Sequence, residues 1–116
     1  MNDEIISSGL IGRTNWDELS WEPFRPGVRV HWFYQTGDDG PAAALLRYEP
    51  GATVPLHEHV GFEHILVLAG SQTADGALAA TGSLMISPPG TRHAIASPEG
   101  CVVLAVWQRP VKILGA

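Results

Sequence analysis

Cysteine is almost absent from this sequence, with Cys101 as the single example among 116 residues. One cysteine excludes an internal disulfide and any cluster of thiolates that would hold a metal. Because the apolar residues 102–104 follow it directly, we expect Cys101 to be a buried small side chain rather than a reactive thiol.

Basic residues are also scarce, and none of them form a run. Seven Lys and Arg stand against twelve Asp and Glu, which gives a net charge of −5 and a pI near 5.4. A nucleic-acid-binding protein usually carries a basic stripe, so we expect no nucleic-acid partner. No apolar run approaches the roughly 20 residues of a membrane span, and the acidic start, residues 1–4, does not resemble a signal peptide. The sequence therefore predicts a cytoplasmic protein with no membrane partner.

Long helical patterns are missing as well, because nine prolines and thirteen glycines interrupt the chain. The composition, 45% hydrophobic and 16% charged, is that of a globular protein with room for one core. We predict an irregular N-terminal arm over residues 1–26 with a short turn near Asn15–Leu19, a single domain over residues 27–109 and a tail over residues 110–116. Trp16, Trp21 and Phe24 are expected to pack the arm onto the domain.

Short strands take the place of helices from Val28 onward. Val28, Val30, Trp32 and Tyr34 alternate as the residues of a half-buried strand do. Further strands are predicted at residues 42–49, 54–59, 62–69, 71–74, 77–80, 83–87, 91–96 and 101–108, with an edge strand at 111–114. Many short strands separated by Gly and Pro turns indicate an all-β sandwich or barrel.

Three histidines and one glutamate have the spacing of a metal site. His57 and His59 are two residues apart, so on a strand their side chains point to the same face. Glu63 lies beyond a turn on the next strand, and His93 follows a Pro-Pro-Gly turn that aims it inward. A buried carboxylate is costly unless it is paired or binds a metal. Three neutral imidazoles and one carboxylate around a divalent cation leave a net charge of +1, and we therefore predict one mononuclear metal site.

Other polar residues nearby are not expected to be ligands. Glu58 alternates with the two histidines and should be a solvated carboxylate. His64 should face away from Glu63, with a hydrogen bond beside the ligands as its alternative role. His31 has no partner at ligand spacing and should be a surface or packed strand residue.

Two sequence motifs of the cupin superfamily appear in these residues. Gly51-x5-His57-x-His59-x3-Glu63-x6-Gly70 resembles the first motif, and Gly82-x5-Pro88-x-Gly90-x2-His93 resembles the second. Ser97 stands where the family usually has Asn, which is not a metal ligand there. The resemblance covers residues 42–108 and implies a jelly-roll barrel of the RmlC-like type, the four ligands above and a homodimer.

Within the superfamily the sequence most resembles the ChrR-like group. The segments that carry this resemblance are residues 45–52, 63–70, 87–94 and 99–101. ChrR itself is a zinc anti-sigma factor with a separate sigma-binding domain. Neither that domain nor its Cys/His motif is found in this sequence, so the resemblance does not extend to a sigma factor.

The resemblance leaves two functions open, and the identity and coordination geometry of the metal would distinguish them. Octahedral Fe²⁺, Mn²⁺ or Ni²⁺ with four protein ligands keeps two positions free, as a dioxygenase-like or isomerase-like enzyme needs for a small oxygenated molecule. Tetrahedral Zn²⁺ would be closed by the same ligands and would suit a structural or sensory protein. Because no second carboxylate or lysine base is evident, we favour metal-centred oxygen chemistry, or no catalysis, over acid–base hydrolysis.

Large side chains on the predicted strands are candidates for a small-molecule pocket. They are Trp32, Tyr34, Tyr48, Met85 and Trp107. Tyr48 is expected to face inward with Ala44 and Leu46. Residues 62–69 are apolar on both faces, so the outer face needs cover from the second sheet, from the arm or from a second subunit of a homodimer.

Overall fold

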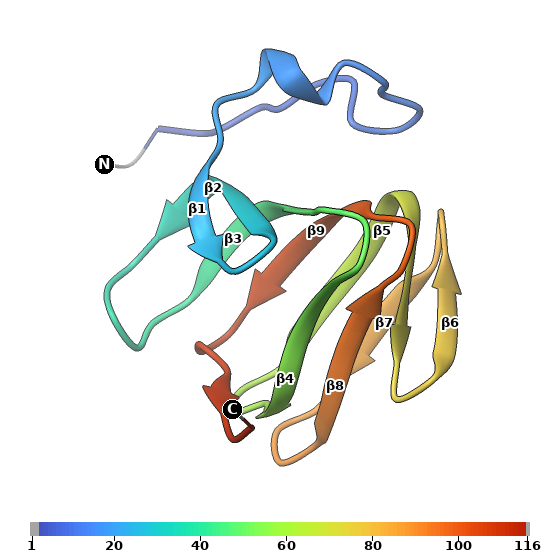
Figure 1. The fold of residues 1–116 in the computed structure, drawn as a ribbon. Helices are drawn as coiled ribbons and strands as arrows, with labels where there is room; N and C mark the ends of the chain where they lie inside the picture. Colours follow the sequence, from blue (N-terminus) through green and yellow to red (C-terminus); the bar gives the residue numbers. More distant parts are fainter. Residues whose placement is uncertain (1–2, 116) are drawn as a thin grey trace.

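Ten short strands and one turn of 3₁₀ helix make up the computed structural model, which describes residues 3–115 (Figure 1). The 3₁₀ turn is η1 (Trp16–Glu18). The strands are β1 (Glu22–Arg25), β2 (Val28–Gln35), β3 (Ala42–Tyr48), β4 (Ala52–Glu58), β5 (Glu63–Ala74), β6 (Ala77–Ala80), β7 (Leu84–Ser87), β8 (Arg92–Ser97), β9 (Cys101–Trp107) and β10 (Lys112–Ile113).

All strand pairs are antiparallel, and the sheet curls back on itself (Figure 1). The order is β1-β2-β3-β9-β5-β8-β4-β10, while β6 and β7 also pair with β5. The 12-residue β5 pairs with β7 and β9 near its start and with β6 and β8 near its end, so it joins the two walls of the barrel. This confirms the all-β jelly-roll barrel.

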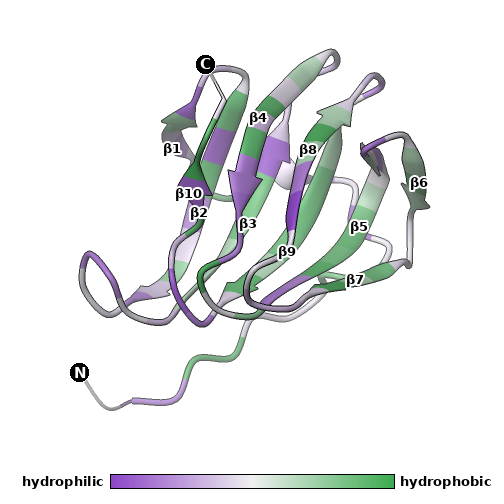
Figure 2. Cartoon of the chain, turned by 90° about the horizontal axis from the view of Figure 1, so that it is seen from below, coloured by the Kyte–Doolittle hydropathy of each residue, from purple (hydrophilic) through white to green (hydrophobic). Residues whose placement is uncertain are grey.

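Two hydrophobic clusters lie on opposite faces of the β3–β9–β5 wall. The inner cluster fills the barrel and contains Leu46, Tyr48 and Val103. The outer cluster contains Leu45 and Leu68 and is covered by aromatic and aliphatic residues of the arm, among them Trp16, Trp21, Leu10 and Leu19. Apolar stretches follow the strands in Figure 2, as expected where both faces of a strand are covered. The arm therefore covers part of the outer face that the sequence left unassigned.

The strand boundaries differ from the predicted ones at two informative places. The predicted break between residues 69 and 71 does not exist, because Gly70 (φ 72°) carries β5 past a bulge without ending it. A side chain at Gly70 would meet the carbonyl oxygen of Gly100, so glycine is required there. The second difference is β1, which lies in the arm that we expected to be irregular. The Pro26-Gly27 turn folds it back onto β2.

None of the helical segments within residues 3–115 is long and apolar enough to cross a membrane.

Candidate metal centre

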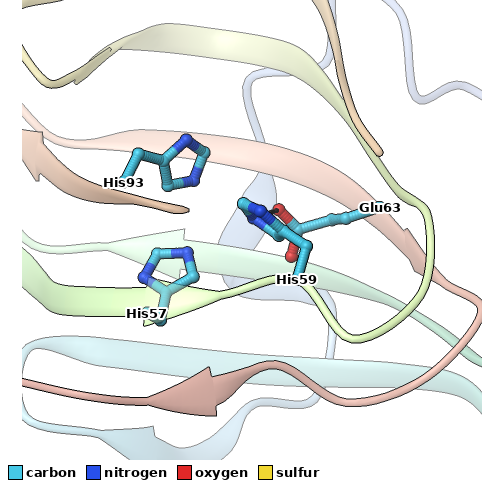
Figure 3. Close-up of side chains that lie close together, drawn as sticks. All are labelled: His57, His59, Glu63 and His93. Atoms are coloured by element: carbon cyan, nitrogen blue, oxygen red, sulfur yellow. Dashed lines mark ion pairs between the residues drawn. The ribbon is translucent and has the colours of Figure 1, made fainter. Parts of the chain in front are cut away.

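His57, His59, Glu63 and His93 converge inside the barrel (Figure 3). His57 on β4 lies directly opposite His93 on β8 in the strand register. His59 follows the end of β4, and Glu63 begins β5 after the intervening turn. One nitrogen or oxygen atom from each of the four side chains lies within 4.8 Å of those of the others. The structure thus brings together all four residues that the spacing singled out.

Two of the histidines are oriented by backbone carbonyls. Nδ1 of His57 lies 2.8 Å from the carbonyl oxygen of Pro55, and Nδ1 of His59 lies 3.0 Å from that of Thr91. A carbonyl oxygen only accepts hydrogen bonds, so each Nδ1 donates its N–H. In the neutral ring the lone pair is then on Nε2, which is the arrangement found around metal-bound histidines.

Glu63 is a buried carboxylate, 6% exposed, with two partners. Nε1 of Trp107 donates a hydrogen bond of 2.5 Å to Oε2, and Nε2 of His59 lies 3.2 Å from Oε1. Burial opposes the negative charge, but the neighbouring His59 and the Trp107 N–H outweigh it and hold the pKa of Glu63 below its usual range. Burial likewise opposes the imidazolium of His59, but the carboxylate outweighs it and raises the pKa of His59.

The other two histidines favour the neutral form. Burial is the main reason that the pKa values of His57 and His93 lie below the usual value of a histidine. The neighbouring imidazoles act in the same direction, since the three ring centroids are 4.6–5.1 Å apart. Neutral rings at physiological pH are what a metal ion requires of its ligands.

These four residues fit a divalent metal ion. Nε2 of His93 is buried and has no hydrogen-bond partner in the described part of the chain, and the only polar atom given near Nε2 of His59 is the Glu63 oxygen, so both nitrogens are available to an ion. Two ligand atoms each about 2.1 Å from one ion would be about 3.0 Å apart at an octahedral angle and about 3.4 Å apart at a tetrahedral one. The 3.2 Å between His59 Nε2 and Glu63 Oε1 lies between these values. Either coordination geometry is therefore compatible with the cluster.

A cavity of about 250 Å³ opens beside the cluster, and His57 and Glu63 form part of its wall. Three of the predicted pocket residues, Trp32, Tyr48 and Trp107, line it. Among the other lining residues, the sequence reasoning gave no pocket role to Phe24, Arg25, Gln35 and Gln72. Phe24 and Arg25 come from the unpredicted β1, and Gln72 comes from β5 beyond its bulge, so no local pattern marked them.

Two predicted pocket residues lie elsewhere. A bulge in β2 after Trp32 pairs Tyr34 with Ala43, and Tyr34 is 43% exposed. Because directly paired residues share a face, Tyr34 points away from the barrel interior with Ala43. Met85 packs against the edge of the inner cluster and does not line the cavity.

The other polar candidates lie outside the cluster. Glu58 forms an ion pair of 2.8 Å with Arg92 on the outer side, and His64 is exposed. His31 lies 2.8 Å from the carbonyl oxygen of Ser20, away from the cluster. Ser97 is fully buried and donates a hydrogen bond to the carbonyl oxygen of Ser71, so it anchors the strand ends where the family usually has Asn.

Cys101 is buried inside the barrel, as the sequence predicted. Burial raises the pKa of its thiol to about 11, so the reactive thiolate form is scarce at neutral pH.

Comparisons with known proteins agree on the fold. A family model described as the ChrR cupin-like domain matches residues 12–112. A comparison with curated protein sequences finds no match.

Solved structures with the same fold include three informative cases. A protein of unknown function with a cupin-like fold from Ralstonia eutropha JMP134 is 21% identical, with a TM-score of 0.66 over 71% of this chain and 55% of that one. A chain in the complex of Rhodobacter sphaeroides SigE with the anti-sigma ChrR is 26% identical, with a TM-score of 0.69 over 80% of this chain and 50% of that one. An acetylacetone dioxygenase from Acinetobacter johnsonii is 13% identical, with a TM-score of 0.74 over 98% of this chain and 83% of that one. This chain thus spans about half the length of the first two.

Proposed function

The chain belongs to the family of ChrR cupin-like domains, and from that premise we propose that it is a metal-dependent enzyme acting on a small oxygenated molecule. One divalent ion would be held by His57, His59, Glu63 and His93. The observation that carries the proposal is the cavity: two of the four ligand residues form part of its wall, so a small molecule can reach the ion. A closed structural site would have no need of such access.

The proposed reaction class is that of a dioxygenase or an isomerase. A bound Fe²⁺, Mn²⁺ or Ni²⁺ supplies open coordination positions and Lewis acidity. The chain's own residues prepare the site: Trp107 fixes the carboxylate of Glu63, and the carbonyls of Pro55 and Thr91 set the tautomers of two histidines. The aromatic walls formed by Phe24 and Trp32 limit the water around a bound molecule. The acetylacetone dioxygenase with this fold supports the choice of small diketones as the first substrates to test.

A zinc-binding sensor or regulator is the second candidate, because the family carries the name of ChrR and a chain in an anti-sigma complex is 26% identical. Two observations weigh against it. The cavity gives access to the cluster, and the one thiol is buried with a raised pKa, so it is poorly suited to sense oxidants. The half-length match to that chain gives no support for a sigma-factor partner.

Metal content is the first measurement. Protein purified without added metal or chelator is analysed for elements, and we expect close to one equivalent of iron, manganese or nickel per chain. The Co²⁺-substituted protein is then titrated with acetylacetone, which should change its visible spectrum because the chelator reaches the ion. Oxygen uptake with small diketones follows in the iron-loaded protein.

Two outcomes would redirect the proposal. Stoichiometric zinc that resists exchange, together with a spectrum that acetylacetone leaves unchanged, would favour the sensor. Peroxide then becomes the discriminating reagent, because a sensor should release metal or change its oligomeric state on oxidation. His64→Ala, one residue beyond Glu63 and exposed, serves as the matched control for the four ligand variants.

A further inference from the structure

Arg25 differs from every other arginine in the described part of the chain. Arg13, Arg29, Arg47, Arg92 and Arg109 each have a carboxylate oxygen within 4.0 Å. Arg25 has none among residues 3–115, although it is partly buried. Its guanidinium lies 4.8 Å from the centre of the Phe24 ring, and both residues line the cavity beside the metal cluster. An arginine held on an aromatic ring without a carboxylate partner is suited to bind an incoming anion.

Tyr48 supplies a second, independent feature of the same cavity. Its side chain is 7% exposed and lines the cavity, yet no hydrogen bond to its hydroxyl is found within the described residues. The hydroxyl is not among the fully enclosed atoms that lack a partner, so it is reachable from the cavity, where a bound molecule can accept its hydrogen bond. Burial raises the pKa of Tyr48 and keeps it a donor, while Glu63 and Arg25 are near enough to act on it.

The charges around the cavity favour a negative ligand although the whole chain has a net charge of −5. With a divalent ion on three neutral imidazoles and Glu63, the cluster carries a charge of +1. Arg25 adds a second positive charge, and Asp38 is the one other acidic residue in the wall besides Glu63. The volume of about 250 Å³ lies below the range of about 300–1,000 Å³ of drug-sized pockets, so the cavity suits a small ligand.

We propose that this cavity selects a small carboxylate anion, with Arg25 as the residue that pairs with the carboxylate and Tyr48 as a hydrogen-bond donor to a second oxygen of the ligand. The inference rests on the proposed function, since the ligand is the molecule that approaches the metal. It narrows the substrate class from any small oxygenated molecule to oxygenated acids such as 2-oxo acids.

Isothermal titration calorimetry with pyruvate and diacetyl, two molecules of similar shape, tests this inference. Pyruvate carries a carboxylate where diacetyl carries a neutral acetyl group. We expect the metal-loaded protein to bind pyruvate at least tenfold more tightly than diacetyl. Arg25→Met should weaken pyruvate binding at least tenfold and change diacetyl binding less than twofold, while Arg25→Lys should retain part of the preference. Tyr48→Phe should weaken both ligands by a similar factor.

Arg29→Met is the matched control, since Arg29 is an exposed arginine on the same hairpin that pairs with Glu49. It should leave both affinities unchanged. Equal affinity of the wild type for the two ligands, no measurable binding of pyruvate, or an Arg25→Met variant that keeps the preference for pyruvate would each overturn the inference.

The proposed function can fail separately from this inference. If acetylacetone changes the Co²⁺ spectrum while pyruvate does not bind, the metal enzyme stands and the anion site is refuted. If the wild type binds no metal, the proposed function fails, and the same titration is made on the metal-free protein. Pyruvate binding that Arg25→Met abolishes would still support the anion site, and its absence would refute it.

Discussion

Hydrogen bonds to individual side-chain atoms orient three of the four candidate metal ligands. Nδ1 of His57 and Nδ1 of His59 are both occupied by backbone carbonyls, and the N–H of Trp107 fixes Glu63. Residues that orient metal ligands in this way typically change metal affinity about 10–100-fold when they are replaced. The site is therefore prepared by the fold before any ion binds.

His59→Ala should lower metal content and thermal stability together. Metal at roughly a thousand times its Kd would stabilise the fold by about 4 kcal/mol, or about 15 °C in Tm for a chain of this size. We expect the variant to lose most of its metal and most of that increment, as read by elemental analysis and calorimetry. His64→Ala should lose neither, and full occupancy in His59→Ala would refute the ligand assignment.

Metal affinity should fall as the pH is lowered, because protons compete for the imidazoles. The raised pKa of His59 means that competition begins above about 6.5, the usual histidine value. The pKa values of His57 and His93 are lowered, so protons should compete with the metal for these two side chains only below that value. A competition titration between pH 8 and pH 5 should show a steady loss of affinity. An affinity that is the same at both ends would contradict this.

The stability of the metal-free protein should respond to the same groups with opposite signs. His57 and His93 have lowered pKa values, so their contribution is present above about pH 6.5 and is lost as the pH falls. The pKa of Glu63 is also lowered, so its contribution to stability is likewise lost as the pH falls, at more acidic pH. His59 has a raised pKa, so its contribution is present below about pH 6.5 and is lost as the pH rises through its folded value. Lowering the pH should therefore remove the contributions of His57, His93 and Glu63, while that of His59 is retained.

At the scale of elements, bulges and turns decide which side chains reach the cavity. The bulge in β2 turns Tyr34 outward, and the bulge in β5 places Leu68 on the outer wall while Gln72 returns to the interior. One extra residue changes the face of every residue beyond it. The β1 hairpin adds Arg25 to the cavity through the turn at Gly27.

Gly70→Ala should destabilise the protein far more than Gly76→Ala. Both glycines have positive φ, 72° and 85°, so each substitution carries a backbone cost of about 1–2 kcal/mol. A Cβ at Gly70 would also overlap the carbonyl oxygen of Gly100, whereas a Cβ at Gly76 meets nothing within 4 Å. Urea denaturation should give a difference of about 2 kcal/mol or more between the variants. Equal losses would mean that the close approach in β5 is unimportant.

At the scale of the whole molecule, an apolar strip remains on the outer wall beyond the arm. Leu84 and Ile86 on β7 are 59% and 53% exposed and lie opposite Leu66 and His64 of β5, next to the exposed Phe62. An apolar strip at a sheet edge is typical of an interaction surface. We propose that it forms the interface of the homodimer that the family resemblance implies.

Leu84→Asp should convert a dimer to a monomer in sedimentation experiments while circular dichroism stays unchanged. Leu78→Asp is the matched control, because Leu78 is also an exposed leucine, 70% against 59% for Leu84, but lies on β6. A wild-type protein that is monomeric at high concentration would remove the proposed interface.

The sequence by itself determined the fold class and the four clustered residues. Period-two alternation fixes which residues share a strand face, and the spacing of His57, His59 and Glu63 across one turn brings them together in any barrel of this kind. His93 could be added because the Pro-Pro-Gly turn limits where the next strand begins. These signals are local, so they can be read from neighbouring residues.

Only the tertiary structure decided the surroundings of the cluster. Arg25 and Trp107 come from opposite ends of the chain, and both line the cavity only because of the strand order, which no local pattern encodes. Bulges moved Tyr34 out of the cavity and Gln72 into it, because a single inserted residue inverts the alternation on which sequence reasoning depends. The cavity that favours an enzyme over a closed zinc site is a property of packing between the two walls of the barrel, and packing is settled only when the chain is folded.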